Sequence, residues 1–159
     1  MLFMRYFFMR HRNVLIIGSL AALGLVIALG VILIRMTASP PAASPSGVLW
    51  TLTSLQVNGQ THQLIPNLAV TLTFHEPSHT ITGNSGCNSY QATYQQQNSQ
   101  IRFQDFAMTA VGCLGPEGVQ ENLYMQALSH AETLLVSANA MTITGAGGKD
   151  ILQFSSSQP

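Results

Sequence analysis

One short segment of the sequence matches a pattern with known chemistry. His75-Glu76-Pro77-Ser78-His79 fits H-E-x-x-H, in which two histidines one helical turn apart bind zinc and the glutamate polarises the metal-bound water. That geometry needs a helix, but Pro77 removes a backbone N–H and disfavours helical backbone at the residue before it. Strand-like sequence flanks the motif on both sides. We therefore expect a hairpin loop, with a zinc hydrolase using His75, Glu76 and His79 as a remote alternative.

The two cysteines, Cys87 and Cys113, form a second pair of residues that could do chemistry. A redox or metal-binding pair needs a Cys-x-x-Cys spacing or an adjacent basic side chain that lowers a thiol pKa, and the sequence around these cysteines has neither. In an oxidising compartment an isolated pair usually forms a disulfide. We predict a structural disulfide that closes a loop of about 26 residues and stabilises the fold by about 3 kcal/mol.

Other catalytic patterns fail on their flanking residues. Residues 83–86 lack the spacing of a nucleophile elbow. The glycines of 145–148 are followed by Lys149-Asp150 and a strand, whereas a phosphate-binding loop needs Lys-Ser/Thr and a helix. We predict no catalytic residue, no cofactor and no metal ligand, and expect that the protein is not an enzyme.

The elements that carry these residues are mostly strands, because apolar and polar residues alternate with a period of two. The expected strands are residues 49–55, 70–74, 80–82, 90–94, 100–103, 141–144 and 151–154. Asn58-Gly59 predicts a tight turn after the first of them.

One stretch has helical spacing instead. Apolar residues recur at helical intervals in 117–133, just after Pro116, which favours a helix over these residues. The predicted fold class is mainly β with one helix. About seven or eight short strands would form a small, partly open antiparallel β-barrel or curled sheet packed on that helix.

The N-terminal part of the chain differs in composition. Residues 14–34 contain no charged residue, and as a helix they would span about 30 Å, the thickness of the bilayer hydrocarbon. Arg5, Arg10 and Arg12 precede this stretch and only Arg35 follows, which predicts a cytoplasmic N-terminus. A cleaved signal peptide is the alternative, although its apolar region is normally shorter, about 7–15 residues.

These features divide the chain into four parts. Residues 1–13 are the predicted cytoplasmic basic tail and 14–34 the transmembrane helix. Residues 35–47, rich in Pro, Ala and Ser, are the linker, and 48–155 are the extracytoplasmic domain. Charged residues make up only 8% of the chain, and beyond Arg35 only Arg102 and Lys149 oppose all six acidic residues. A domain without a basic face is not expected to bind nucleic acid.

Five segments of the domain resemble, in order along the chain, the pattern of the META domain family, typified by the HslJ-like heat-shock proteins. The second one fits G-x-x-G-C-N-x-[YF], and the fourth fits M-T-x-x-x-C. The segments are residues 50–52, 83–90, 101–103, 108–113 and 121–128, with the signature positions Gly83, Gly86, Cys87, Asn88, Tyr90, Thr109 and Cys113. Ala92, where glycine is common, and Tyr124, one place later than the usual aromatic residue, depart from the pattern.

The resemblance implies an envelope or secreted domain with a small barrel-like sheet and a helix, associated with stress tolerance and without an established catalytic reaction. Gly83 and Gly86 are expected to adopt backbone conformations closed to other residues, and Asn88 to bond nearby backbone in a tight turn.

The expected function is therefore that of a non-enzymatic, single-pass protein of the cell membrane. Its partners would be the membrane, through residues 14–34, and an unknown envelope protein that it binds in support of envelope or stress tolerance. The alternative is a binder of a lipid or small apolar ligand in the barrel.

Overall fold

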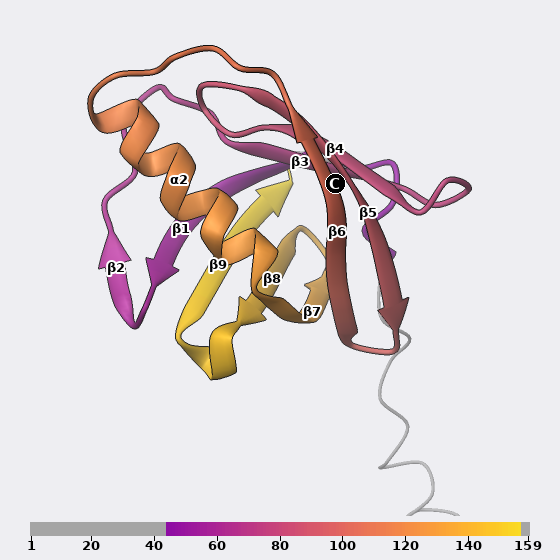
Figure 1. Cartoon of the computed structure of the whole chain (residues 1–159). Coiled ribbons are helices and arrows are strands. Elements are labelled where there is room, and N and C mark those ends of the chain that lie inside the picture. The colour runs from indigo at the N-terminus through magenta and orange to yellow at the C-terminus, as the bar shows by residue number, and fades with distance from the viewer. Residues whose placement is uncertain (1–43, 157–159) are drawn as a thin grey trace, which may run out of the picture. The chain divides into compact units, whose positions relative to one another are not determined.

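The computed structural model describes residues 44–156 (Figure 1). In this part of the chain, no helix is both long enough and apolar enough to cross a membrane. The predicted basic tail, the predicted transmembrane helix at 14–34 and most of the predicted linker lie outside the described residues.

The described chain consists of short strands with one α-helix between the sixth and seventh of them. In chain order the elements are β1 (Trp50–Val57), β2 (Gln60–His62), β3 (Thr71–His75), β4 (Thr80–Asn84), β5 (Ser89–Gln97), β6 (Gln100–Met108), α2 (Pro116–Ser129), β7 (Ala131–Ser137), β8 (Ala140–Gly145), the short 3₁₀ turn η1 (Ala146–Gly148) and β9 (Asp150–Ser156).

The strands close into an antiparallel barrel (Figure 1). β1 pairs with β3 on one side and with β9 on the other, so β1 and β3–β9 form a closed eight-strand barrel while β2 extends β1 as a short hairpin. The expectation of a partly open barrel is therefore wrong. Closure comes from the β1–β9 ladder, which runs from Trp50↔Ser156 to Gln56↔Ile151. A ladder between the first and last strands of the barrel removes the unpaired edges of the sheet.

The shortest ladder of the barrel joins β6 and β7. Their ladder contains the single pair Gln100↔Thr133, supported by a hydrogen bond from Leu134 N–H to the carbonyl of Ser99 at 2.8 Å. In the chain, α2 lies between β6 and β7, and it packs against β1, β6, β8 and β9.

Side chains fill the interior of the barrel. The largest buried ones are Trp50, Phe74 and, from the helix, Tyr124. Phe74 meets Tyr94 edge-on at a ring-centroid distance of 5.2 Å, a favourable aromatic geometry. The interior is thus a hydrophobic core of the kind that small barrels form.

The helix ends earlier than expected. The predicted helix covered residues 117–133, but α2 stops at Ser129, and residues 131–137 form β7. Although Ala131 continues the helical spacing, the chain beyond His130 pairs with β8, for example at Leu134↔Ile143, and that ladder replaces another helical turn. Gly145 permits this change of direction, because a Cβ there would collide with the carbonyl oxygen of His130.

Two strands were not predicted, β7 and the three-residue β2. The turn between β1 and β2 was predicted correctly: Asn58 and Gly59 both have positive φ, 54° and 79°, as in a tight hairpin turn.

The last residues of the predicted linker contact the barrel. Gly47 donates its N–H to the carbonyl of Phe74 at 3.0 Å, and the Trp50 indole donates to the carbonyl of Pro45 at 3.0 Å. The chain therefore enters the domain beside the end of β3 that leads into the β3–β4 hairpin turn.

Candidate functional site

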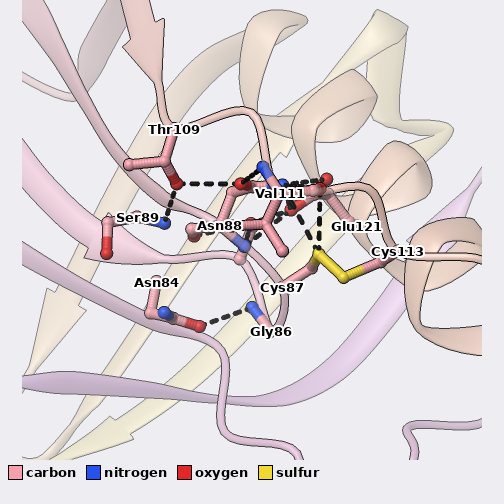
Figure 2. Close-up of a disulfide and its surroundings, with 10 residues drawn as sticks. Asn84, Gly86, Cys87, Asn88, Ser89, Thr109, Val111, Cys113 and Glu121 are labelled. Carbon is pink, nitrogen blue, oxygen red and sulfur yellow. Dashed lines mark hydrogen bonds between the residues drawn. A yellow bond between two sulfur atoms is a disulfide. The ribbon is translucent and has the colours of Figure 1, made fainter.

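The family-signature residues gather at the opposite end of β3 and β4, where two loops meet the start of α2 (Figure 2). One loop joins β4 to β5, and the other, residues 109–115, joins β6 to α2. The disulfide expected between Cys87 and Cys113 is present and links the two loops, with 6.2 Å between the Cα atoms. We call the polar residues behind this disulfide, Ser85, Asn88, Thr109 and Glu121, the signature cluster.

Asn88 is the centre of the signature cluster and is 3% exposed. Its Oδ1 accepts hydrogen bonds from the Thr109 hydroxyl and from the Val111 N–H, both at 2.8 Å. Its Nδ2 donates to the Val111 carbonyl at 3.2 Å and to Glu121 Oε1 at 2.9 Å (Figure 2). The Asn88 amide thus joins both loops and the helix, which is a wider role than the local turn contact expected from the sequence.

The carboxylate of Glu121 accepts hydrogen bonds from the other donors of the signature cluster. Its Oε2 accepts from the Asn88 N–H at 3.0 Å and from the buried Ser85 hydroxyl. An ionised carboxylate is an acceptor only, so a cluster of converging donors suits it. Sequence reasoning did not select Glu121 as a site residue. The only signal for it was its place in the helical segment that resembles the family pattern.

The two signature glycines are required for different reasons. Gly86 has φ of 101°, a conformation that favours glycine, and its N–H bonds Asn84 Oδ1 at 2.8 Å (Figure 2). Gly83 is not in the left-handed region, so the expected backbone explanation is wrong for it. A Cβ on Gly83 would instead collide with the carbonyl oxygen of Thr71 and the ring of Tyr90.

Tyr90 reaches beneath Gly83 to a second tyrosine in the core. Its hydroxyl lies 2.9 Å from the Thr71 carbonyl, to which it donates, and 2.5 Å from the hydroxyl of Tyr124. Burial raises the pKa of both phenols, and Tyr124 is completely enclosed. Both are therefore neutral hydrogen-bonding groups at ordinary pH.

The outer side of the 109–115 loop carries apolar side chains. Val111 is 59% exposed and Leu114 93% exposed, although the backbone between them is tied down by Asn88 and Cys113. The loop thus presents two exposed apolar side chains on a fixed backbone. The polar groups of the signature cluster bond one another behind it, so the arrangement holds a surface in place.

The H-E-x-x-H segment forms the predicted hairpin. β3 ends at His75, β4 begins at Thr80, and the exposed residues between them make the turn. His75 Nε2 lies 2.8 Å from the hydroxyl of Thr82, and His79 has φ of 49°. Over residues 44–156, no group of three or more His, Cys, Asp or Glu side chains is placed to hold a metal ion.

A polar contact outside the signature cluster, between His130 and Asp150, was not predicted from the sequence. Asp150 is buried, with its Oδ2 2.9 Å from His130 Nδ1 and its Oδ1 accepting from the Asn58 N–H at 2.7 Å. The contact fastens the end of α2 to the β1–β2 turn. Residues so far apart in the chain carried no shared pattern from which the contact could be predicted.

Solved structures share this fold. An NMR structure of a protein from Burkholderia xenovorans is 24% identical, with a TM-score of 0.61, and the match covers 77% of this chain and 94% of that one. A crystal structure of a DUF4847 family protein from Bacteroides vulgatus is 14% identical, with a TM-score of 0.55 and coverage of 70% and 93%. A search of curated proteins gave no match.

The sequence itself matches the META domain over residues 45–158, a range that includes the closed barrel, both loops of the signature cluster and the disulfide. Because the match covers most of the chain and the structure brings the signature residues together, the chain belongs to the META domain family.

Proposed function

We propose that this protein is a non-enzymatic, membrane-anchored domain of the cell envelope that binds another protein through the 109–115 loop and thereby supports stress tolerance. The observation that carries the proposal is the exposure of Val111 and Leu114 on a loop fixed by the signature cluster and the disulfide. Family membership supports the domain, and the apolar stretch at 14–34 with its preceding arginines supports the anchor and its orientation.

Fixing the loop in advance favours binding. A flexible loop would lose conformational entropy on binding, whereas a loop held by Asn88 and Cys113 has lost most of it during folding. When a partner buries an exposed leucine on such a support, the removal of its apolar surface from water contributes to affinity.

The loop is also accessible from outside the domain. It lies at the far end of β3 and β4 from residues 44–47, through which the chain enters. A partner on the loop therefore does not compete with the chain segment that leads to residues 1–43.

The test is photo-crosslinking from a diazirine amino acid at position 114 of the full chain in cells under heat stress. The matched control carries the same amino acid at position 135, since Leu135 on β7 is 64% exposed but far from the loop. We expect a discrete protein adduct from position 114 that position 135 does not give, and its loss with Val111→Glu. Identical adducts from both positions, or none from position 114, would contradict the proposal.

A further inference from the structure

A small groove lies beside the N-terminal half of α2. It has a volume of about 250 Å³. Its walls are mainly apolar, and the apolar lining includes Leu55, Ile65, Val119 and Leu123, whereas His62, Gln63 and Gln120 are the polar members. A concave apolar site with few polar groups is the usual form of a small-molecule site.

Gln120 has an unmatched hydrogen-bond donor at this groove. The residue is 5% exposed, and its Oε1 accepts the Ile65 N–H at 2.8 Å. That bond fixes the orientation of the amide, because a flipped amide would place two donors against each other. Nε2 is then left buried with no partner among residues 44–156. A buried donor without an acceptor is unfavourable, so an acceptor from outside the chain would be stabilised there.

Charge around the groove selects the kind of acceptor. The residues that line the groove include no acidic residue and no lysine or arginine, and the Glu121 carboxylate is bonded to Asn88 in the signature cluster. A carboxylate ligand would lose its hydration there without a lysine or arginine to pair with, which is unfavourable. An uncharged oxygen, such as a ketone, ester or amide carbonyl, accepts a hydrogen bond without that cost.

We propose that this groove binds a small, uncharged, apolar molecule through one carbonyl oxygen. The oxygen accepts a hydrogen bond from Gln120 Nε2, and the apolar part packs on Val119, Leu123 and Ile65. Because Nε2 is shielded from bulk water, binding requires a small rearrangement of the side chains around it. The groove does not include residues of the 109–115 loop, so a failure to bind this ligand would not affect the proposal that the loop binds a protein.

Benzophenone is a suitable probe, because it is apolar and uncharged, has one carbonyl and forms covalent bonds at that carbonyl on illumination. The full chain in non-ionic detergent is illuminated with increasing benzophenone, and labelled residues are located by mass spectrometry. We expect saturable labelling confined to residues 62–65 and 116–123. The charged analogue 4-benzoylbenzoate should label this groove at least fivefold less.

Gln120→Glu keeps the side-chain shape and the acceptor for Ile65 but replaces the donor with an oxygen, so labelling should fall about tenfold or more, the change produced by roughly 1.4 kcal/mol. Leu135→Gln, on β7, is the matched control and should label like the wild type. If circular dichroism shows that Gln120→Glu does not fold, Val119→Glu at an exposed position serves instead and should abolish labelling. Equal labelling of the wild type and the folded variant, labelling spread over other surfaces, or equal labelling by the charged analogue would overturn the proposal.

Discussion

The two ends of the β3–β4 hairpin carry the two most distinctive sequence motifs of the chain, and they differ in what those motifs contact. At one end, residues 76–79 are exposed, and the side chains of His75 and Ser78 bond only nearby residues. The distant bonds of this turn are made by its backbone, from the Glu76 N–H to Ser46 and from the Tyr94 N–H to the His79 carbonyl. At the other end, Asn88 is buried and bonds residues from 21 to 33 positions away. A motif contributes to a site only where the fold brings its side chains to distant partners.

The largest expected effect is at the centre of the signature cluster. Asn88→Ala removes the acceptor of the Val111 N–H and the donors to Glu121, so we expect the free energy of unfolding to fall by about 3–4 kcal/mol. Urea unfolding followed by fluorescence of the single tryptophan, the buried Trp50, measures it. Ser78→Ala in the opposite turn is the control. Equal, small effects of the two variants would remove the contrast between the ends.

The disulfide is expected to contribute nearly as much. Replacing both Cys87 and Cys113 with Ala should lower the free energy of unfolding by about 3 kcal/mol, because the unfolded chain loses a long covalent loop. A reducing agent should lower the stability of the wild type by a similar amount and leave the double variant unchanged. If reduction left the stability of the wild type unchanged, the non-covalent bonds of the signature cluster would be sufficient to hold the two loops together.

High pH should weaken the same end of the barrel through the buried tyrosines. Burial raises the pKa of Tyr90 and Tyr124 in the folded chain, whereas tyrosine in the unfolded chain ionises near pH 10. The unfolded chain therefore gives up protons first, so this contribution to stability is complete below pH 10 and is lost as the pH rises above it. We expect a loss of about 2 kcal/mol between pH 9 and 11.

Tyr124→Phe separates this effect from general alkaline unfolding. The variant loses the bond to Tyr90, but its unfolding free energy should depend less steeply on pH above 10. An unchanged slope in the variant would assign the alkaline loss to other groups.

The smallest effects are expected at the hairpin turn. His75→Ala and His79→Gly should change the free energy of unfolding by no more than about 0.5 kcal/mol, because His79 is exposed and glycine suits its positive φ. Added zinc should leave the unfolding midpoint of the full chain unchanged. A midpoint raised by zinc in the wild type and not in His79→Gly would restore a metal-binding role to this turn.

Local patterns predicted a large part of the fold. Alternation in residues 70–74 and 151–154, the Asn58-Gly59 turn and Pro77 in the hairpin turn all depend on neighbouring residues, and the structure agrees with each. β7 was missed because Ala131 continued the helical spacing of 117–128 across the helix end. Local spacing does not reveal that the next residues pair with β8.

The buried polar partners were beyond prediction for a related reason. Glu121, Gln120 and Asp150 are ordinary polar residues in the sequence, and their roles arise from donors that lie 33, 55 and 92 positions away. A single sequence contains no record of which distant donor will meet which acceptor.

The sequence by itself determined the strand-rich composition, the turns, the pair of cysteines and the resemblance to the family, because these depend on residue type and short spacing. Only the tertiary structure decided that the barrel closes through β1 and β9, that Gly83 is required by a close approach, and that Asn88 and Glu121 hold the 109–115 loop. The physical reason is that closure and burial bring together groups from distant parts of the chain. These groups are removed from water only in the folded chain, so each contact contributes to stability only once the whole fold has formed.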